Sequence, residues 1–391
     1  MPALQALIDK GKLKPGQSVF INGCLGGVGR AATQIALMRG ASVGGSCRVH
    51  REVCDRALAA SRGLLEAAVG PKGETAMRAI QIERFGGPEV LAEADVPEPT
   101  PTAGKVLIDV TAAGVNYADI HRVADDYLAD QELPFIPGQE VVGTLEDGSR
   151  VVSLVRGGGY AERALGPLDL TFTVADGIGD MEALALMLQG TTAWHLLRTS
   201  AHMQEGETVV VFAAAGGVGS TAVQLARAWR AGRVIAVASS QEKRDLALSL
   251  GADAAVDSGS TDLTEELIEA NGGRGVDIVL EMTGGEVFRA AMESLAHFGR
   301  LVHYGAASRT MAPPVEPREL MSNCTAVVGF WLMQCTRGMV QEALDDLWAM
   351  AARGELRPLI GEIYPLSDAR RAHEDLRARG TVGKLALDPG R

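Results

Sequence analysis

Two glycine-rich loops of the same pattern are the residues best suited to chemistry in this chain. One loop is residues 23–29 (GCLGGVG), and the other is residues 213–219 (AAAGGVG). The second loop follows the apolar run 208–212 and precedes the helix-forming run 222–226, which is the strand–turn–helix context that such a motif requires. A dinucleotide pyrophosphate binds where the backbone approaches closely and a helix N-terminus points at it. The contacts predicted from this loop are Ala214, Gly216, Gly217, Val218 and Gly219.

The residues after the next apolar run indicate which dinucleotide binds. Folds that prefer NAD carry an acidic residue about 20 positions past the loop, where it binds the ribose 2′-hydroxyl. Here Ser239 and Ser240 occupy that place, and Lys243 and Arg244 follow them. Hydroxyl groups and cations suit a 2′-phosphate, although both cations are also compatible with an ordinary solvated helix face. The missing carboxylate favours NADPH as the cofactor.

The elements that must position these residues follow an α/β pattern. From about residue 193, apolar strands alternate with helices, as at 234–237, 241–250, 276–280, 287–296 and 299–304. This alternation predicts a doubly wound parallel sheet of the Rossmann type. Residues 77–192 are instead rich in short strands broken by Gly and Pro, which predicts a compact β-rich domain. The tail is predicted to form helices at 340–353 and 367–379 and a closing strand at 383–387.

The first loop belongs to a segment, residues 1–76, that differs from the rest of the chain. Residues 1–48 parallel residues 194–239 in pattern, and the likeness then stops. The segment holds ten Lys and Arg against five Asp and Glu, whereas the whole chain has a net charge of -12. A single strand–helix–strand unit cannot complete a dinucleotide site. We therefore interpret residues 1–76 as a partial, non-functional Rossmann-like duplicate; the alternative is a second nucleotide site.

Charge and composition exclude several classes of protein. The net negative charge argues against nucleic-acid binding, which depends on neutralising phosphates. No apolar run reaches the length of a membrane span, so no membrane partner is expected. Five cysteines in 391 residues are too few and odd in number for a disulfide framework. These features predict a reduced, cytoplasmic protein.

Residues 77–391 resemble the zinc-independent quinone oxidoreductase branch of the medium-chain dehydrogenase/reductase superfamily. The matching segments are 85–91 (FGGPEVL), 112–119 (AAGVNYAD), 137–140 (PGQE), 158–162 (GGYAE), 189–193 (QGTTA) and 213–219. The resemblance implies a GroES-like catalytic domain in two parts, 77–197 and 331–391, around a Rossmann domain at 198–330. It also implies a homodimer that reduces quinones or activated alkenes with NADPH.

The same resemblance assigns residues to the nicotinamide and the acceptor. Residues expected along the cofactor are Asn116, Thr192, Tyr304, Gly305 and Lys384, and those lining the nicotinamide and substrate pocket are Phe330, Trp331 and Leu332. Asn116 and Tyr127 are expected to position and polarise the acceptor as neutral hydrogen-bond donors. His121 stands where the family often has another tyrosine.

No metal site is predicted. Zinc-dependent relatives carry Cys at the position of Asn116 and His at the position of Gln139. The chain has no cysteine between Cys54 and Cys324, so neither the catalytic nor the structural zinc site of those relatives can form with its usual ligands.

Two alternatives to quinone reduction stay open at this level. Residues 330–332 (FWL) resemble a segment of enoyl reductases, which would act on enoyl-thioesters or α,β-unsaturated ketones. A protein of another class, which binds NADPH without catalysis, would share the glycine loop and the cofactor contacts.

Overall fold

The computed structural model describes residues 18–22, 42–46, 75–126, 128 and 131–391. The chain divides into two units, Met1–Thr75 and Ala76–Arg391. In the first unit, β1 (Ser18–Asn22) pairs in parallel with β2 (Ser42–Ser46). A parallel pair is what a strand–helix–strand repeat predicts. The first glycine loop, residues 23–29, lies outside the described residues, so the duplication stays a prediction.

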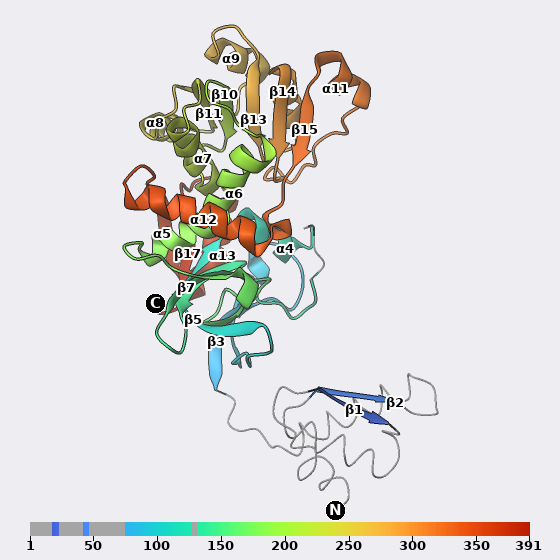
Figure 1. Cartoon of the computed structure of the whole chain (residues 1–391), viewed down its shortest axis with the longest axis vertical. Helices are drawn as coiled ribbons and strands as arrows, with labels where there is room; N and C mark the ends of the chain where they lie inside the picture. The colour runs from blue at the N-terminus through green and yellow to red at the C-terminus, as the bar shows by residue number, and fades with distance from the viewer. Residues whose placement is uncertain (1–17, 23–41, 47–74, 127, 129–130) are drawn as a thin grey trace, which may run out of the picture. The chain divides into compact units, whose positions relative to one another are not determined.

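The second unit contains a six-stranded parallel sheet, and we call residues 208–329 the six-stranded lobe. Its strand order is β12-β11-β10-β13-β14-β15. The strands are β10 (Thr208–Phe212), β11 (Arg233–Ala238), β12 (Ala254–Asp257), β13 (Val276–Glu281), β14 (Leu295–His303) and β15 (Ala326–Gly329). The helices are α7 (Gly217–Ala228), α8 (Gln241–Ser249), α9 (Leu263–Ala270), α10 (Gly285–Glu293) and α11 (Pro317–Asn323). Figure 1 shows α8 near one edge of this sheet and α11 beside β15 at the other. The doubly wound sheet predicted from the sequence is confirmed.

The central strands are buried on both faces, which explains why this sheet could be predicted from the sequence. Every residue of β10 is buried, because helices cover both faces of a parallel sheet. The helix expected over 287–296 is wrong at its end: α10 stops at Glu293, and residues 295 and 296 already belong to β14. Strand β14 pairs in parallel with β13, and in this pairing Leu295 lies opposite Val276, so the chain is already extended there.

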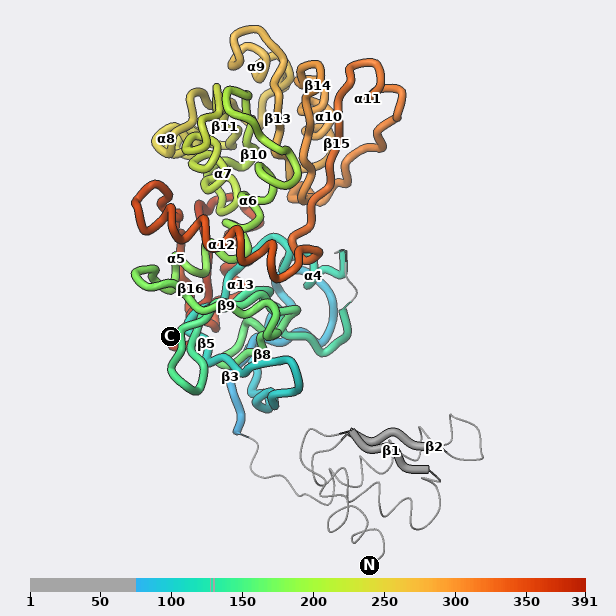
Figure 2. Tube along the Cα trace, viewed as in Figure 1, coloured from blue at the N-terminus to red at the C-terminus, as the bar shows by residue number. Residues whose placement is uncertain are grey.

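The rest of the unit is built around a second, mainly antiparallel sheet, and we call residues 76–173 and 360–388 the seven-stranded lobe. Its order is β16-β17-β5-β6-β7-β9, with β8 also paired to β5. The strands are β5 (Lys105–Val115), β6 (Glu140–Thr144), β7 (Arg150–Leu154), β8 (Arg163–Pro167), β9 (Thr171–Thr173), β16 (Ile360–Pro365) and β17 (Lys384–Asp388). A separate hairpin pairs β3 (Ala76–Gln81) with β4 (Ala92–Pro97). Strand β17 pairs with β5, and Figure 2 shows the C-terminus near β5, so the chain leaves this lobe and returns to it.

Strand β5 is longer than the sequence indicates. The alternation of apolar and polar residues predicts a strand over 106–110, but β5 continues to Val115. Residues 112–114 (Ala, Ala, Gly) have weak strand preference, and pairing extends the strand: Ala113, Gly114 and Val115 pair with β17. Asn116 therefore follows the strand directly and begins α4 (Tyr117–Ala124).

A helical stretch connects the two lobes. Residues 180–200 run without a break through α5 (Asp180–Ala185), a π-helical turn (Leu186–Gly190), α6 (Thr191–His195) and a second π-helical turn (Leu196–Ser200). Helix α12 (Arg337–Ala352) lies between the lobes together with α6 (Figure 1). One apolar core includes Val209 of β10, Val152 of β7 and Leu347 of α12, so both lobes share it. Helix α13 (Ala369–Arg377) completes the seven-stranded lobe.

None of the helices in the described part of the chain combines the length and apolar character that crossing a bilayer demands.

Candidate functional site

A cavity of about 980 Å³ lies between the carboxyl ends of the six-stranded sheet and the seven-stranded lobe. Ligands in open α/β sheets bind at this edge. Predicted site residues that line it are Asn116, Thr192, Gly216, Gly217, Val218, Gly219, Ser239, Lys243, Tyr304, Gly305, Phe330, Trp331 and Leu332. Three others, Ala214, Ser240 and Lys384, are not among its lining residues. Tyr127 lies outside the described residues.

Glycines allow the second glycine loop to pack closely against its neighbours. Gly216 is the N-cap of α7, so the N-terminus of this helix faces the cavity. A β-carbon on Gly219 would overlap the main-chain oxygen of Ala213, and one on Gly217 would overlap the side chain of Gln189. The loop is thus a close-packed cradle of the kind that holds a pyrophosphate.

Two cations lie close together in the wall of the cavity. The Lys243 ammonium donates a hydrogen bond to the main-chain oxygen of Arg379 at 2.6 Å, and both residues line the cavity. Burial, and then the charge of Arg379, lower the pKa of Lys243. Two cations held together in the same cavity as the glycine loop form a site for an anionic group. Ser239 lines the same cavity.

The neighbours of Lys243 have structural roles. Ser240 caps α8, and its Oγ accepts a hydrogen bond from the main-chain nitrogen of Lys243 at 3.3 Å. Arg244 forms an ion pair with Asp257 at 2.8 Å. Arg379 was not predicted from the sequence, since it lies more than a hundred residues from Lys243 and carries no motif.

Aromatic and polar side chains line the same cavity. Tyr304 follows β14, and residues 330–332 follow β15. Phe330 stacks on His195 with ring centroids 5.8 Å apart. Burial, and then the charge of Glu281, raise the pKa of Tyr304, so this hydroxyl stays neutral. The space in the cavity between these side chains is suited to a flat, apolar ligand.

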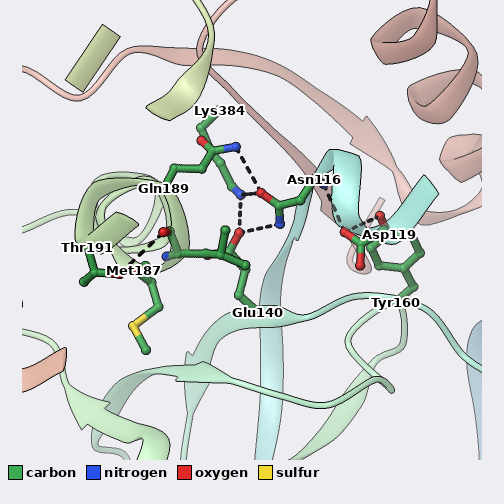
Figure 3. A network of polar contacts seen from close by, with 9 residues as sticks. Asn116, Asp119, Glu140, Tyr160, Met187, Gln189, Thr191 and Lys384 are labelled. Carbon is green, nitrogen blue, oxygen red and sulfur yellow. Dashed lines mark hydrogen bonds and ion pairs between the residues drawn. The ribbon is translucent and has the colours of Figure 1, made fainter. Parts of the chain in front are cut away.

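A buried polar network holds Asn116 in place (Figure 3). Its Nδ2 donates to Glu140 at 2.8 Å, and its Oδ1 accepts from Gln189 at 3.0 Å and from Lys384 at 3.1 Å. Lys384 also forms an ion pair with Glu140, and both side chains are 0% exposed. The main-chain nitrogen of Leu188 donates to Glu140 at 3.0 Å. Lys384 therefore contacts Asn116 from the buried interior of the protein and is not itself part of the cavity wall.

A second buried group lies next to this network (Figure 3). Asp119 accepts hydrogen bonds from the main-chain nitrogen of Asn116 at 3.0 Å and from the Tyr160 hydroxyl at 3.3 Å. The same hydroxyl lies 3.0 Å from Nε2 of His373. Burial raises the pKa of Asp119 to about 6 and lowers the pKa of His373 to about 3. These three residues fix the start of α4 and hence the position of Asn116.

The residues at the positions of the zinc ligands do not fit a zinc ion. Asn116 and Gln139 carry amides, whereas zinc takes thiolate, imidazole or carboxylate ligands. Across the part of the chain that the structure describes, no three His, Cys, Asp or Glu side chains come together to share a metal ion.

Comparisons with known proteins agree with this architecture. The sequence model of the alcohol dehydrogenase GroES-like domain matches residues 102–162, and that of the zinc-binding dehydrogenase family matches residues 217–349. The rat quinone oxidoreductase is 33% identical over 328 residues, which cover 81% of this chain and 98% of the rat protein. The solved quinone oxidoreductase of Thermus thermophilus, studied also as its NADPH complex, is 40% identical with a TM-score of 0.71. It matches over 80% of this chain and 100% of its own.

A second solved structure has lower identity and a closer backbone. The quinone oxidoreductase of Escherichia coli, complexed with NADPH, is 29% identical with a TM-score of 0.76, over 80% of this chain and 100% of its own. The shared region corresponds in extent to the second unit and leaves out a segment about as long as the first. The chain belongs to the quinone oxidoreductase branch of the medium-chain dehydrogenase/reductase superfamily.

Proposed function

We propose that this protein transfers a hydride from NADPH to a quinone or another activated carbonyl or alkene acceptor, without zinc. The observation that carries the proposal is that one cavity is lined by the glycine loop, the cation pair, the aromatic residues and Asn116. Quinone oxidoreductases of similar sequence, two of them solved with NADPH, support it.

The preference for NADPH rests on the cation pair. Lys243 and Arg379 repel each other, and a 2′-phosphate between them relieves this repulsion. Ser239 supplies a hydroxyl beside them, and no acidic residue takes its place in the sequence. The glycine loop, residues 216–219, would hold the pyrophosphate, and Thr192, Tyr304 and Gly305 would lie along the nicotinamide.

When bound, NADPH supplies the hydride, and the chain supplies position and hydrogen bonds. The carboxamide of Asn116 is oriented by Glu140 and Gln189, so one Nδ2 hydrogen stays available toward the cavity. Phe330, Trp331 and Leu332 would enclose the acceptor. Tyr127 is proposed as a second neutral donor.

An enoyl reductase is the second candidate. It is favoured by one observation, namely that Phe330, Trp331 and Leu332 all line the cavity. Rates of NADPH oxidation with quinones, enones and enoyl-thioesters distinguish the two enzymes, and absence of turnover with all three would instead support an NADPH-binding protein without catalysis.

We further propose the three domain ranges expected above, a cytoplasmic location and a homodimer. Strand β15 is an edge strand, and its end residues Ala326 and Gly329 are exposed, so a second copy could extend the sheet there. Sedimentation tests the dimer, and cell fractionation tests the location.

The cofactor assignment is tested by substitution. Lys243→Glu places a carboxylate where the 2′-phosphate would lie, so the KM for NADPH should rise at least about 10-fold while the KM for NADH changes little. Activity should also survive dialysis against a chelator. Equal efficiency of the wild type with NADPH and NADH, or loss of activity with loss of stoichiometric zinc, would contradict the proposal.

A further inference from the structure

We propose that Gln139 donates a hydrogen bond from its Nε2 to the carbonyl oxygen of the acceptor. The inference rests on the proposed function and assigns a residue that the family resemblance marks only as the place of a missing zinc ligand. It begins from a buried donor without a partner.

Gln139 is 2% exposed and lines the cavity. Among the described residues, nothing accepts a hydrogen bond from its Nε2. A buried donor left unpaired costs free energy, and native proteins rarely retain one without a reason. A ligand that supplies an acceptor atom is such a reason.

The unpaired donor does not result from a loosely held backbone. The main-chain oxygen of Gln139 accepts a hydrogen bond from the main-chain nitrogen of Val155 at 2.8 Å. Gly138 has a φ of +95°, and a β-carbon there would lie 2.6 Å from the Tyr160 ring. The main chain at Gln139 is therefore fixed, while the last torsion of a glutamine side chain is soft. The amide can turn toward an oxygen that enters the cavity.

The neighbouring amides offer less than Gln139 does: Asn116 keeps one Nδ2 hydrogen, whereas the whole Nε2 group of Gln139 has no partner among the described residues. The Oδ1 of Asn116 already accepts two hydrogen bonds, and one of its Nδ2 hydrogens is used by Glu140. Gln189 has the opposite deficit: its Nε2 is paired with Asn116, and its Oε1, close to Gly217, has no partner among the residues described. The cavity thus offers an acceptor at the glycine loop and a donor at Gln139. A carbonyl oxygen needs the donor.

The chemistry makes this donor useful. As the hydride arrives with its electron pair, one acceptor carbon or oxygen gains the hydrogen and negative charge develops on the carbonyl oxygen. The cofactor leaves as NADP⁺, and a proton from water completes the hydroquinone or the saturated ketone. A preorganised neutral donor stabilises the developing charge more than the starting carbonyl.

The test replaces Gln139 by Met, which has similar length and no donor. Reduction of 1,4-naphthoquinone by the Gln139→Met variant should fall at least about 10-fold in kcat/KM, and binding of the quinone to the NADP⁺-loaded protein should weaken by calorimetry. NADPH affinity should stay within about 2-fold, because the glycine loop is untouched. The midpoint of urea denaturation of the free protein should not fall, because an unpaired buried donor has been removed.

Gln224→Met is the matched control. Gln224 is 9% exposed and does not line the cavity, and its amide is fully paired: Nε2 donates to Ser220 at 3.1 Å and to Arg357 at 3.0 Å, and Oε1 accepts from Arg357 at 2.9 Å. This variant should lower the denaturation midpoint and leave quinone binding unchanged.

The outcomes separate the inference from the proposed function. If the wild type reduces the quinone and Gln139→Met does so equally well, or if the variant loses NADPH affinity instead of quinone affinity, the inference is wrong. A lowered denaturation midpoint with unchanged quinone binding would make Gln139 a structural residue and equally overturn it. If the wild type itself reduces no quinone or enone, the proposed function fails first.

Discussion

Removing the Lys384 ammonium tests the buried network that holds Asn116. In Lys384→Met, the Glu140 carboxylate stays buried at 0% exposure and keeps two donors, Asn116 and the main-chain nitrogen of Leu188. In Glu140→Gln, the ammonium loses its counter-charge. Leaving one charge of a buried pair uncompensated costs about 3–5 kcal/mol. Removing both charges costs much less, because no ion then stays buried without its partner.

Urea denaturation followed by tryptophan fluorescence measures these costs. All four tryptophans, residues 194, 229, 331 and 348, lie in the second unit, so the signal reports the unit that contains the pair. A loss of about 3 kcal/mol should lower the midpoint by roughly 1 M in each single variant. The double variant Lys384→Met/Glu140→Gln should lose no more than either single one.

An exposed ion pair provides the control for the buried pair. Arg353→Met removes an exposed ion pair with Glu355 and should leave the midpoint unchanged. If the losses of the two single variants add in the double variant, Lys384 and Glu140 are not coupled and the reasoning is refuted. NADPH affinity of the double variant also tests whether Lys384 holds the cofactor directly, as the family resemblance implies.

Two further predictions follow from the loop and from the buried titratable groups. Gly219→Ala places a methyl group against the Ala213 main-chain oxygen and should weaken NADPH binding at least about 10-fold by fluorescence titration, whereas Gly338→Ala, which meets nothing within 4 Å, should not; equal affinities would exclude a close-packed cradle. Because burial lowers the pKa of His373 to about 3, its stabilising effect is present above pH 6.5 and declines as the pH falls, so the stability advantage of wild type over His373→Gln should shrink by about 1.4 kcal/mol per unit between pH 6 and 4.5, and a pH-independent difference would contradict this.

The six-stranded lobe could be predicted in outline because its central strands are buried on both faces. A continuous apolar run such as 208–212, followed by a glycine loop, predicts a buried parallel strand. Strand β12 and helix α9 are short and only partly buried, and they were not predicted. The length of β5 depends on β17, which is far away in the sequence.

Cavity residues that a motif, a position or the family resemblance marks singly were predicted from the sequence. Residues that matter only through a contact with a distant residue were not. The glycine loop and Lys243 were predicted from a motif and a position in the sequence, and Asn116 from the family resemblance. Nothing local marks Arg379, which meets Lys243 only because α13 folds back to the cavity. The unpaired state of the Gln139 amide is likewise a property of its surroundings and not of its residue type.

Gly383 and Lys384 are adjacent, yet they serve different lobes. The main-chain nitrogen of Gly383 donates to Ala215 in the glycine loop at 2.9 Å, while Lys384 joins Glu140. The contacts of the six-stranded lobe therefore do not stop at residue 329, where the lobe itself ends, because the glycine loop also contacts residue 383. This bears on recombination between related genes. Because this contact joins main-chain atoms, any residue except proline at position 383 could donate it, so a transplanted six-stranded lobe needs the final strand to lie in the same place beside its glycine loop. Exchange of this lobe between related proteins is therefore expected to depend on the backbone path of the C-terminal segment more than on its side chains.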